Sequence, residues 1–106
     1  MAVPSFIQVV PAGNGGNNTL YSATLGASAT SGVQVAGNDM IIRVVGSLPI
    51  TIRFGPSGSL AAATATDIYI PANSPETFDL GHINNAFSIF AFQASTVVTV
   101  NQVAKN

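Results

Sequence analysis

Short runs of β-branched and aromatic residues recur along the chain, and turn-forming residues separate them. No segment carries apolar residues at the three- and four-residue spacing of an amphipathic helix. Runs of this kind at intervals of about 8–12 residues are typical of antiparallel sandwiches and barrels. The expected strands are Ser5–Val10, Thr19–Leu25, Gly32–Ala36, Met40–Val45, Ile50–Phe54, Thr66–Ile70, Thr77–Leu80, Ala86–Phe92 and Thr96–Val103. The sequence therefore predicts an all-β fold, an antiparallel, jelly-roll-like β-sandwich of about eight strands.

Glycine, proline and asparagine lie between these runs. Pro11–Asn18 is the longest predicted loop, and Gly46–Pro49 is expected to be a hairpin loop between two strong strands. Ala61–Ala65 has helical propensity on its alanines alone. We expect it to be extended, because Thr64 and Thr66 lead directly into the next strand.

Alternation within the runs predicts which side chains are buried. Ile50, Ile52 and Phe54 should face the core, while Thr51 and Arg53 face solvent.

The same reasoning buries Phe78 and Leu80 and exposes Asp79. Ala86–Phe92 is apolar on both faces, with Phe90 and Phe92 opposite the side of Phe87. Either this strand is central in the sandwich or its second face contacts another chain.

Charged residues are scarce, at 7% of the chain against a usual share of about 25%. With a net charge of -1, copies of the chain repel one another little. Such a surface suits a subunit that packs against others, so we expect a homo-oligomer. The three basic residues form no patch for nucleic acid, and no apolar stretch is long enough for a membrane helix.

The 106 residues are expected to form one domain, 1–106. Residues 1–39 would supply the N-terminal strands and the loop rich in glycine and asparagine, and residues 40–103 a core β-meander. The chain has no cysteine, which favours assembly in a reducing cytoplasm. Its first residues show neither a basic region nor a long apolar block, so we expect no signal peptide.

Candidate catalytic groups are few. Glu76, Asp79 and His82 are three residues apart, and that spacing directs side chains to opposite faces of a strand. Gly13–Gly16 resembles an anion nest but lacks the helix and lysine of a phosphate loop, and Asn17–Thr19 matches a glycosylation acceptor. Asp39 and Asp67 are expected to accept hydrogen bonds from backbone N–H groups in turns. We therefore expect no enzymatic activity, no metal and no cofactor.

Several segments resemble small virion proteins of tailed bacteriophages. They are Ile50–Gly55, Ala63–Ala72, Pro75–Gly81 and Phe87–Ala91. The resemblance covers about residues 40–103 and implies a β-sandwich or jelly roll that decorates or cements a capsid. It transfers no catalytic residue.

The expected function is that of a structural virion protein, assembled in the host cytoplasm, whose partner is a major capsid protein. The candidate interface residues are Phe90, Phe92, Val3 and Pro4. Two alternatives remain open: another virion component, such as a tail, baseplate or head-fibre subunit, and a carbohydrate-binding module. A carbohydrate site would require an exposed row of aromatic side chains, whereas Tyr21, Tyr69 and the phenylalanines are expected mainly in the core.

Overall fold

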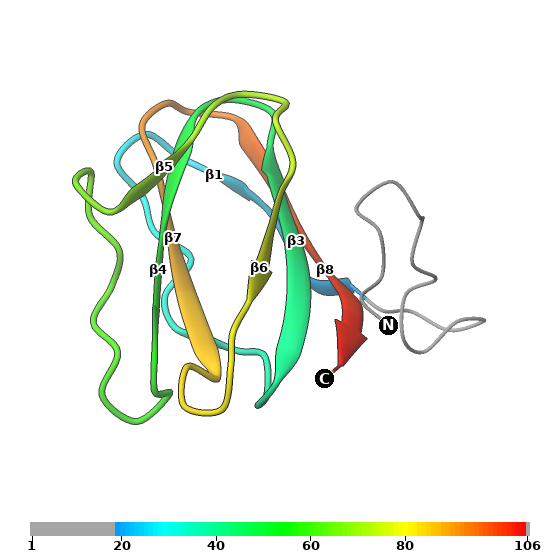
Figure 1. Ribbon diagram of the computed structural model, residues 1–106. Helices are drawn as coiled ribbons and strands as arrows, with labels where there is room; N and C mark the ends of the chain where they lie inside the picture. Colours follow the sequence, from blue (N-terminus) through cyan, green and yellow to red (C-terminus); the bar gives the residue numbers. More distant parts are fainter. Residues whose placement is uncertain (1–18, 106) are drawn as a thin grey trace.

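The computed structural model describes residues 19–105, which form two four-stranded antiparallel sheets packed face to face (Figure 1). The strands are β1 (Thr19–Leu25), β2 (Gln34–Val35), β3 (Met40–Gly46), β4 (Ile50–Gly55), β5 (Ile68–Ile70), β6 (Glu76–Asp79), β7 (Ala86–Ala91) and β8 (Thr96–Lys105). The prediction of an antiparallel all-β sandwich is confirmed. The predicted strand at Ser5–Val10 lies outside the described residues.

The strands pair in a nested order. One sheet, called sheet A here, has the order β1-β8-β3-β6, and the other, sheet B, has the order β2-β7-β4-β5. Consequently β1 pairs with β8, β2 with β7, β3 with β6 and β4 with β5. Among the strands within residues 19–105, only β4 and β5 are both consecutive in sequence and neighbours in a sheet.

Two local predictions are therefore wrong. Gly46–Pro49 is not a hairpin loop, and residues 40–103 are not a meander, because β3 and β4 lie in opposite sheets. Each of these strands has an apolar face, and placing them face to face buries both. The link is tight: a Cβ on Gly46 would lie 2.7 Å from the Leu48 carbonyl oxygen. Ser47 fixes it to β8 by donating its N–H to the Val97 carbonyl and accepting the Val97 N–H at Oγ, both at 2.9 Å.

The core lies between the inner faces of the two sheets. Its large, fully buried apolar side chains are Ile42, Val44, Ile50, Ile52, Ile70, Phe87, Ile89, Val98 and Val100. Burying each of these side chains contributes about 1.5–3 kcal/mol. The predicted inward alternation of Ile50 and Ile52 is confirmed.

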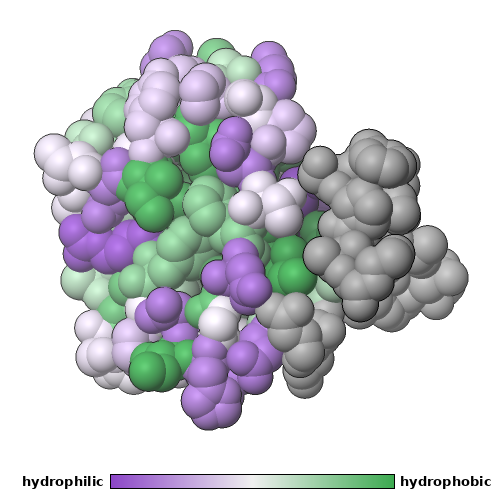
Figure 2. Space-filling view, viewed as in Figure 1, coloured by the Kyte–Doolittle hydropathy of each residue, from purple (hydrophilic) through white to green (hydrophobic). Residues whose placement is uncertain are grey.

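At one side of the sandwich, Phe54 from β4 packs against Phe78 from β6, with 4.9 Å between ring centroids. Both rings are only partly buried, while Leu80 is buried and Asp79 is exposed. The predicted register of β6 is thus correct, although Phe78 lies at the margin of the core. Figure 2 shows apolar residues reaching the surface in the middle of the face seen in Figure 1, with more polar residues around them.

Ala61–Ala65 forms no helix, as predicted. No helix within residues 19–105 has the length and apolar character needed to cross a membrane.

Candidate interaction surface on sheet B

Three aromatic side chains gather on the outer face of sheet B, and we call them the aromatic cluster: Tyr69, Phe90 and Phe92. Tyr69 is in β5, Phe90 is in β7, and Phe92 follows the end of β7. The Phe92 ring centroid lies 6.1 Å from that of Tyr69 and 5.2 Å from that of Phe90.

Strand register explains why these rings meet. Thr51 of β4 is opposite Tyr69 on one side and Phe90 on the other, so the three share a row on the outer face. Phe92 is two residues beyond Phe90, which places it near the same face. Tyr69 is 57% exposed, and the two phenylalanines are half-buried. Tyr69 is therefore the most exposed ring of the aromatic cluster. The expectation that it lies in the core is wrong.

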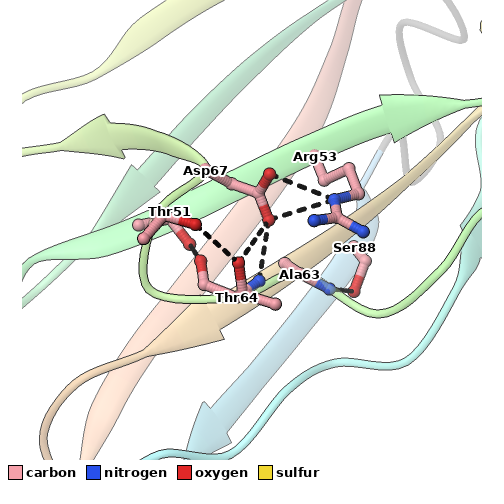
Figure 3. A network of polar contacts seen from close by, with 7 residues as sticks. Thr51, Arg53, Ala63, Thr64, Asp67 and Ser88 are labelled. Atoms are coloured by element: carbon pink, nitrogen blue, oxygen red, sulfur yellow. Dashed lines mark hydrogen bonds and ion pairs between the residues drawn. The ribbon is translucent and has the colours of Figure 1, made fainter.

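Beside the aromatic cluster, an ion pair fixes the segment that precedes β5. The Arg53 Nε lies 3.0 Å from both carboxylate oxygens of Asp67 (Figure 3). Asp67 Oδ2 also accepts the backbone N–H of Thr64 at 2.7 Å and the Thr64 hydroxyl at 3.3 Å. Asp67 therefore closes a local turn and joins that turn to β4.

The same segment, residues 61–67, covers polar groups of the sheet. Thr51 donates its hydroxyl to the Thr64 carbonyl at 2.6 Å, and Ala63 donates its N–H to Ser88 Oγ at 2.9 Å. Both Thr51 and Ser88 are fully buried. Thr51 was predicted to face solvent, and that prediction is wrong. Its side chain does leave the core, as alternation requires, but the covering segment excludes water and supplies its hydrogen bond.

The pKa of Asp67 is held below its ordinary value of 3.8. The largest cause is the hydrogen bond from the Thr64 N–H, and the Arg53 guanidinium adds to it against the opposing effect of burial. The predicted turn-acceptor role of Asp67 is therefore confirmed. The ion pair with Arg53 was missed, because nothing in the sequence shows that residues 61–67 fold back over β4.

The candidate catalytic residues do not converge. His82 Nδ1 lies 3.4 Å from Asp39 Oδ2, a partner that spacing along the chain did not suggest. The two side chains are 82% and 38% exposed. Asp79 instead accepts the Gly81 N–H at 3.1 Å. Within residues 19–105, no group of three His, Cys, Asp or Glu side chains could hold a metal ion.

Asp39 also departs from its predicted role. It has a positive φ of 54° and donates its own N–H to the Gly81 carbonyl at 2.6 Å. With the His82 contact, this hydrogen bond joins the β2–β3 turn to the β6–β7 loop.

Of the predicted interface residues, Phe90 and Phe92 are part of the aromatic cluster, whereas Val3 and Pro4 lie outside the described residues. Gly13–Gly16, considered and set aside as an anion nest, and Asn17 of the glycosylation motif also lie outside them.

Comparison with known proteins finds no matching family model, no matching curated protein and no matching solved structure.

Proposed function

We propose that this chain is a structural virion protein of a tailed bacteriophage, of the capsid-decoration type. In this role it binds the outer surface of the capsid and holds neighbouring major capsid proteins together. The observation that carries the proposal is the aromatic cluster on sheet B, in which Tyr69 is exposed and two phenylalanines are half-buried, on a chain with very little charge. Protein interfaces favour aromatic side chains and exclude charged ones at their centre.

The action would be mechanical. Burying the aromatic cluster at a junction between capsid proteins raises the free energy needed to separate them. A buried area of about 1,600 Å² per site is sufficient for specific binding, and many copies on one particle act together.

The nested strand order also supports this proposal. Among the described strands, β1 pairs with β8, β2 with β7, β3 with β6 and β4 with β5. From this nested pairing we infer that the sandwich is a jelly roll. Jelly rolls occur in viral capsid proteins and also in lectins. The fold therefore agrees with the proposed role but does not choose between these two functions.

The arrangement of the rings favours a protein partner over a sugar. A sugar ring stacks on flat aromatic faces that are presented side by side. Here the Tyr69 and Phe92 planes are inclined at 54°, and the Phe90 and Phe92 planes at 89°. The first pair is tilted and the second is edge-to-face, so the rings make an uneven apolar surface, which suits contact with side chains.

The number of copies per particle tests the proposal. Quantitative mass spectrometry should be performed on purified phage particles whose genome encodes this chain. A decoration protein should be present in numbers comparable with the major capsid protein. A few copies per particle would indicate a tail, baseplate or head-fibre subunit, and the absence of the chain from particles would contradict the proposal. Glycan binding that is lost in Tyr69→Ala would instead favour the carbohydrate-binding alternative.

A further inference from the structure

The four edge strands of the sandwich differ in how well they are protected. In sheet B the edges are short, because β2 has two residues and β5 has three. In sheet A, β6 has four residues and carries Glu76 and Asp79 at its ends. Short length and charge are the usual ways in which proteins prevent an edge from pairing with another strand.

The remaining edge, β1, is neither short nor charged, and the one irregularity in its pairing with β8 lies near its start, between Thr19 and Tyr21. It is seven residues long, Thr-Leu-Tyr-Ser-Ala-Thr-Leu, with no charged residue and no proline. Within residues 19–105 it pairs with β8 alone. Half of the backbone N–H and C=O groups of an edge strand point away from its neighbour.

The sequence of β1 is suited to pairing with itself. In an antiparallel pair centred on Ser22, Ser22 lies opposite its own copy, and Tyr21 lies opposite Ala23. The large side chain then meets the small one on both sides of the two-fold axis. Tyr21 and Ala23 are half-buried and Ser22 is exposed, so this register keeps inner side chains on the inner face of both copies.

The Tyr21 ring marks where a second copy would contact the core. It lies at the margin of the core, 6.4 Å from the Phe87 ring in an edge-to-face arrangement. Ala23 of a second copy would cover this ring. Since β1 carries no charge and the whole chain has a net charge of -1, no like charges oppose each other across the axis.

We propose that β1 is a self-association edge, which pairs antiparallel with β1 of a second copy about a two-fold axis centred on Ser22. The two four-stranded A sheets then form one continuous sheet across the dimer. This inference gives a surface to the homo-oligomer that the scarcity of charge leads us to expect. The aromatic cluster lies on the other sheet, so both surfaces can be occupied at once.

Substitution by lysine tests the edge. Ser22→Lys brings two ammonium groups face to face at the axis, and Thr77→Lys is the matched control, an exposed residue on edge strand β6 of the same sheet. Light scattering during size-exclusion chromatography should show dimers for the parent and for Thr77→Lys. The dimer dissociation constant of Ser22→Lys should rise at least tenfold. A monomeric parent, or equal dissociation constants for both variants, would overturn the proposal.

Disulfide trapping tests the register itself. Because the chain has no cysteine, Ser22→Cys introduces a single thiol. Opposed residues in an antiparallel pair have Cα atoms about 4.5 or 5.5 Å apart, within the range that a disulfide spans. Mild oxidation should convert most Ser22→Cys protein to a covalent dimer and leave Thr77→Cys monomeric. The proposal fails if Ser22→Cys stays monomeric or if both variants cross-link equally.

Failure of this inference can be distinguished from failure of the proposed function. Particles that contain the chain while Ser22→Cys does not cross-link would exclude this edge and leave the virion role intact. Cross-linking through Ser22→Cys with no chain in particles would do the reverse.

Discussion

The outer faces of the two sheets follow the same strand alternation but have different surroundings. The face of sheet A carries Ser22, Thr24, Arg43 and Thr99, and its most exposed large apolar side chain is Val97. The face of sheet B is covered in part by residues 61–67 and carries the aromatic cluster beside them. Alternation thus determines which side chains leave the core, but not whether they then meet water or another segment.

Polar side chains also have different roles on the outer faces of the two sheets. On sheet A, threonine and serine side chains such as Ser22 and Thr24 face outward without a covering segment, beside the charged Arg43. On sheet B, Thr51 and Ser88 hold the covering segment through hydrogen bonds, and the Arg53–Asp67 ion pair fixes its end. Sheet B therefore has a shaped, partly apolar outer face, which is the face we assign to binding a partner.

The largest effect should come from the core that supports both faces. Phe87 is fully buried, so Phe87→Ala should lower the free energy of unfolding by about 3–5 kcal/mol. Phe90→Ala, on the half-buried outer face of the same strand, should cost clearly less. Urea denaturation of both variants measures the difference, and equal losses would show that the aromatic cluster is part of the core.

A smaller loss should follow from removing the carboxylate that holds residues 61–67. Asp67→Ala leaves the Thr64 N–H and the Arg53 guanidinium without their partner. Because the ion pair is partly exposed, the expected loss is about 1–2 kcal/mol in the free energy of unfolding. If urea denaturation shows that the free energy of unfolding changes by less than about 0.5 kcal/mol, the contacts of Asp67 do not stabilise residues 61–67.

The same carboxylate should make the covering segment sensitive to acid. The folded protein holds the pKa of Asp67 below its ordinary value of 3.8, so ionised Asp67 stabilises the fold above that pH. This contribution disappears as pH falls from 3.8 through the lower folded pKa. The stability difference between the parent and Asp67→Asn should therefore shrink in this window. A difference that stays constant down to pH 2 would exclude Asp67 as its source.

The smallest effect should be seen on sheet A. Thr99 lies on its outer face opposite Ser22 and Val45, away from the core. Thr99→Ala should change the free energy of unfolding by less than about 0.5 kcal/mol, with no dependence on acid pH. If Thr99→Ala lowered the free energy of unfolding as much as Asp67→Ala, the Thr99 side chain would have to make a stabilising contact with another segment on the outer face of sheet A.

Much of the fold could be predicted from local pattern, because the alternation of apolar and polar residues along a strand indicates which face is buried. The bounds of β1 were predicted to the residue, and Ile50 and Ile52 were correctly assigned to the core. The pairing order of the strands could not be predicted in this way. Gly46–Pro49 connects two strands in opposite sheets, and such a connection requires the same turn-forming residues as a hairpin loop within one sheet.

The candidate surface was predicted only in part. The two-sided apolar pattern of Ala86–Phe92 correctly indicated that Phe90 and Phe92 face away from the inner side of β7. Ala61–Ala65 forms no helix, but it ends in a turn and the next strand begins only at Ile68. The contacts of Tyr69 and the burial of Thr51 depend on how β5 and residues 61–67 fold onto β4, which are contacts between segments distant from one another in sequence. For the same reason, the contact between His82 and Asp39, which lies 43 residues earlier in the chain, could not be predicted from spacing.

The central claim, that sheet B provides the face that binds the capsid, is tested most directly by adding purified protein back to particles. Particles from a phage lacking the gene for this chain would be mixed with the parent, Tyr69→Ala or Thr99→Ala, and the fraction that sediments with the particles measured. Tyr69 is exposed, so its removal should leave folding intact while removing an aromatic contact typical of binding hot spots. The account predicts that parent and Thr99→Ala bind equally and that the dissociation constant of Tyr69→Ala rises about tenfold or more, equivalent to about 1.4 kcal/mol. Equal binding of all three proteins, or no binding of the parent, would contradict it.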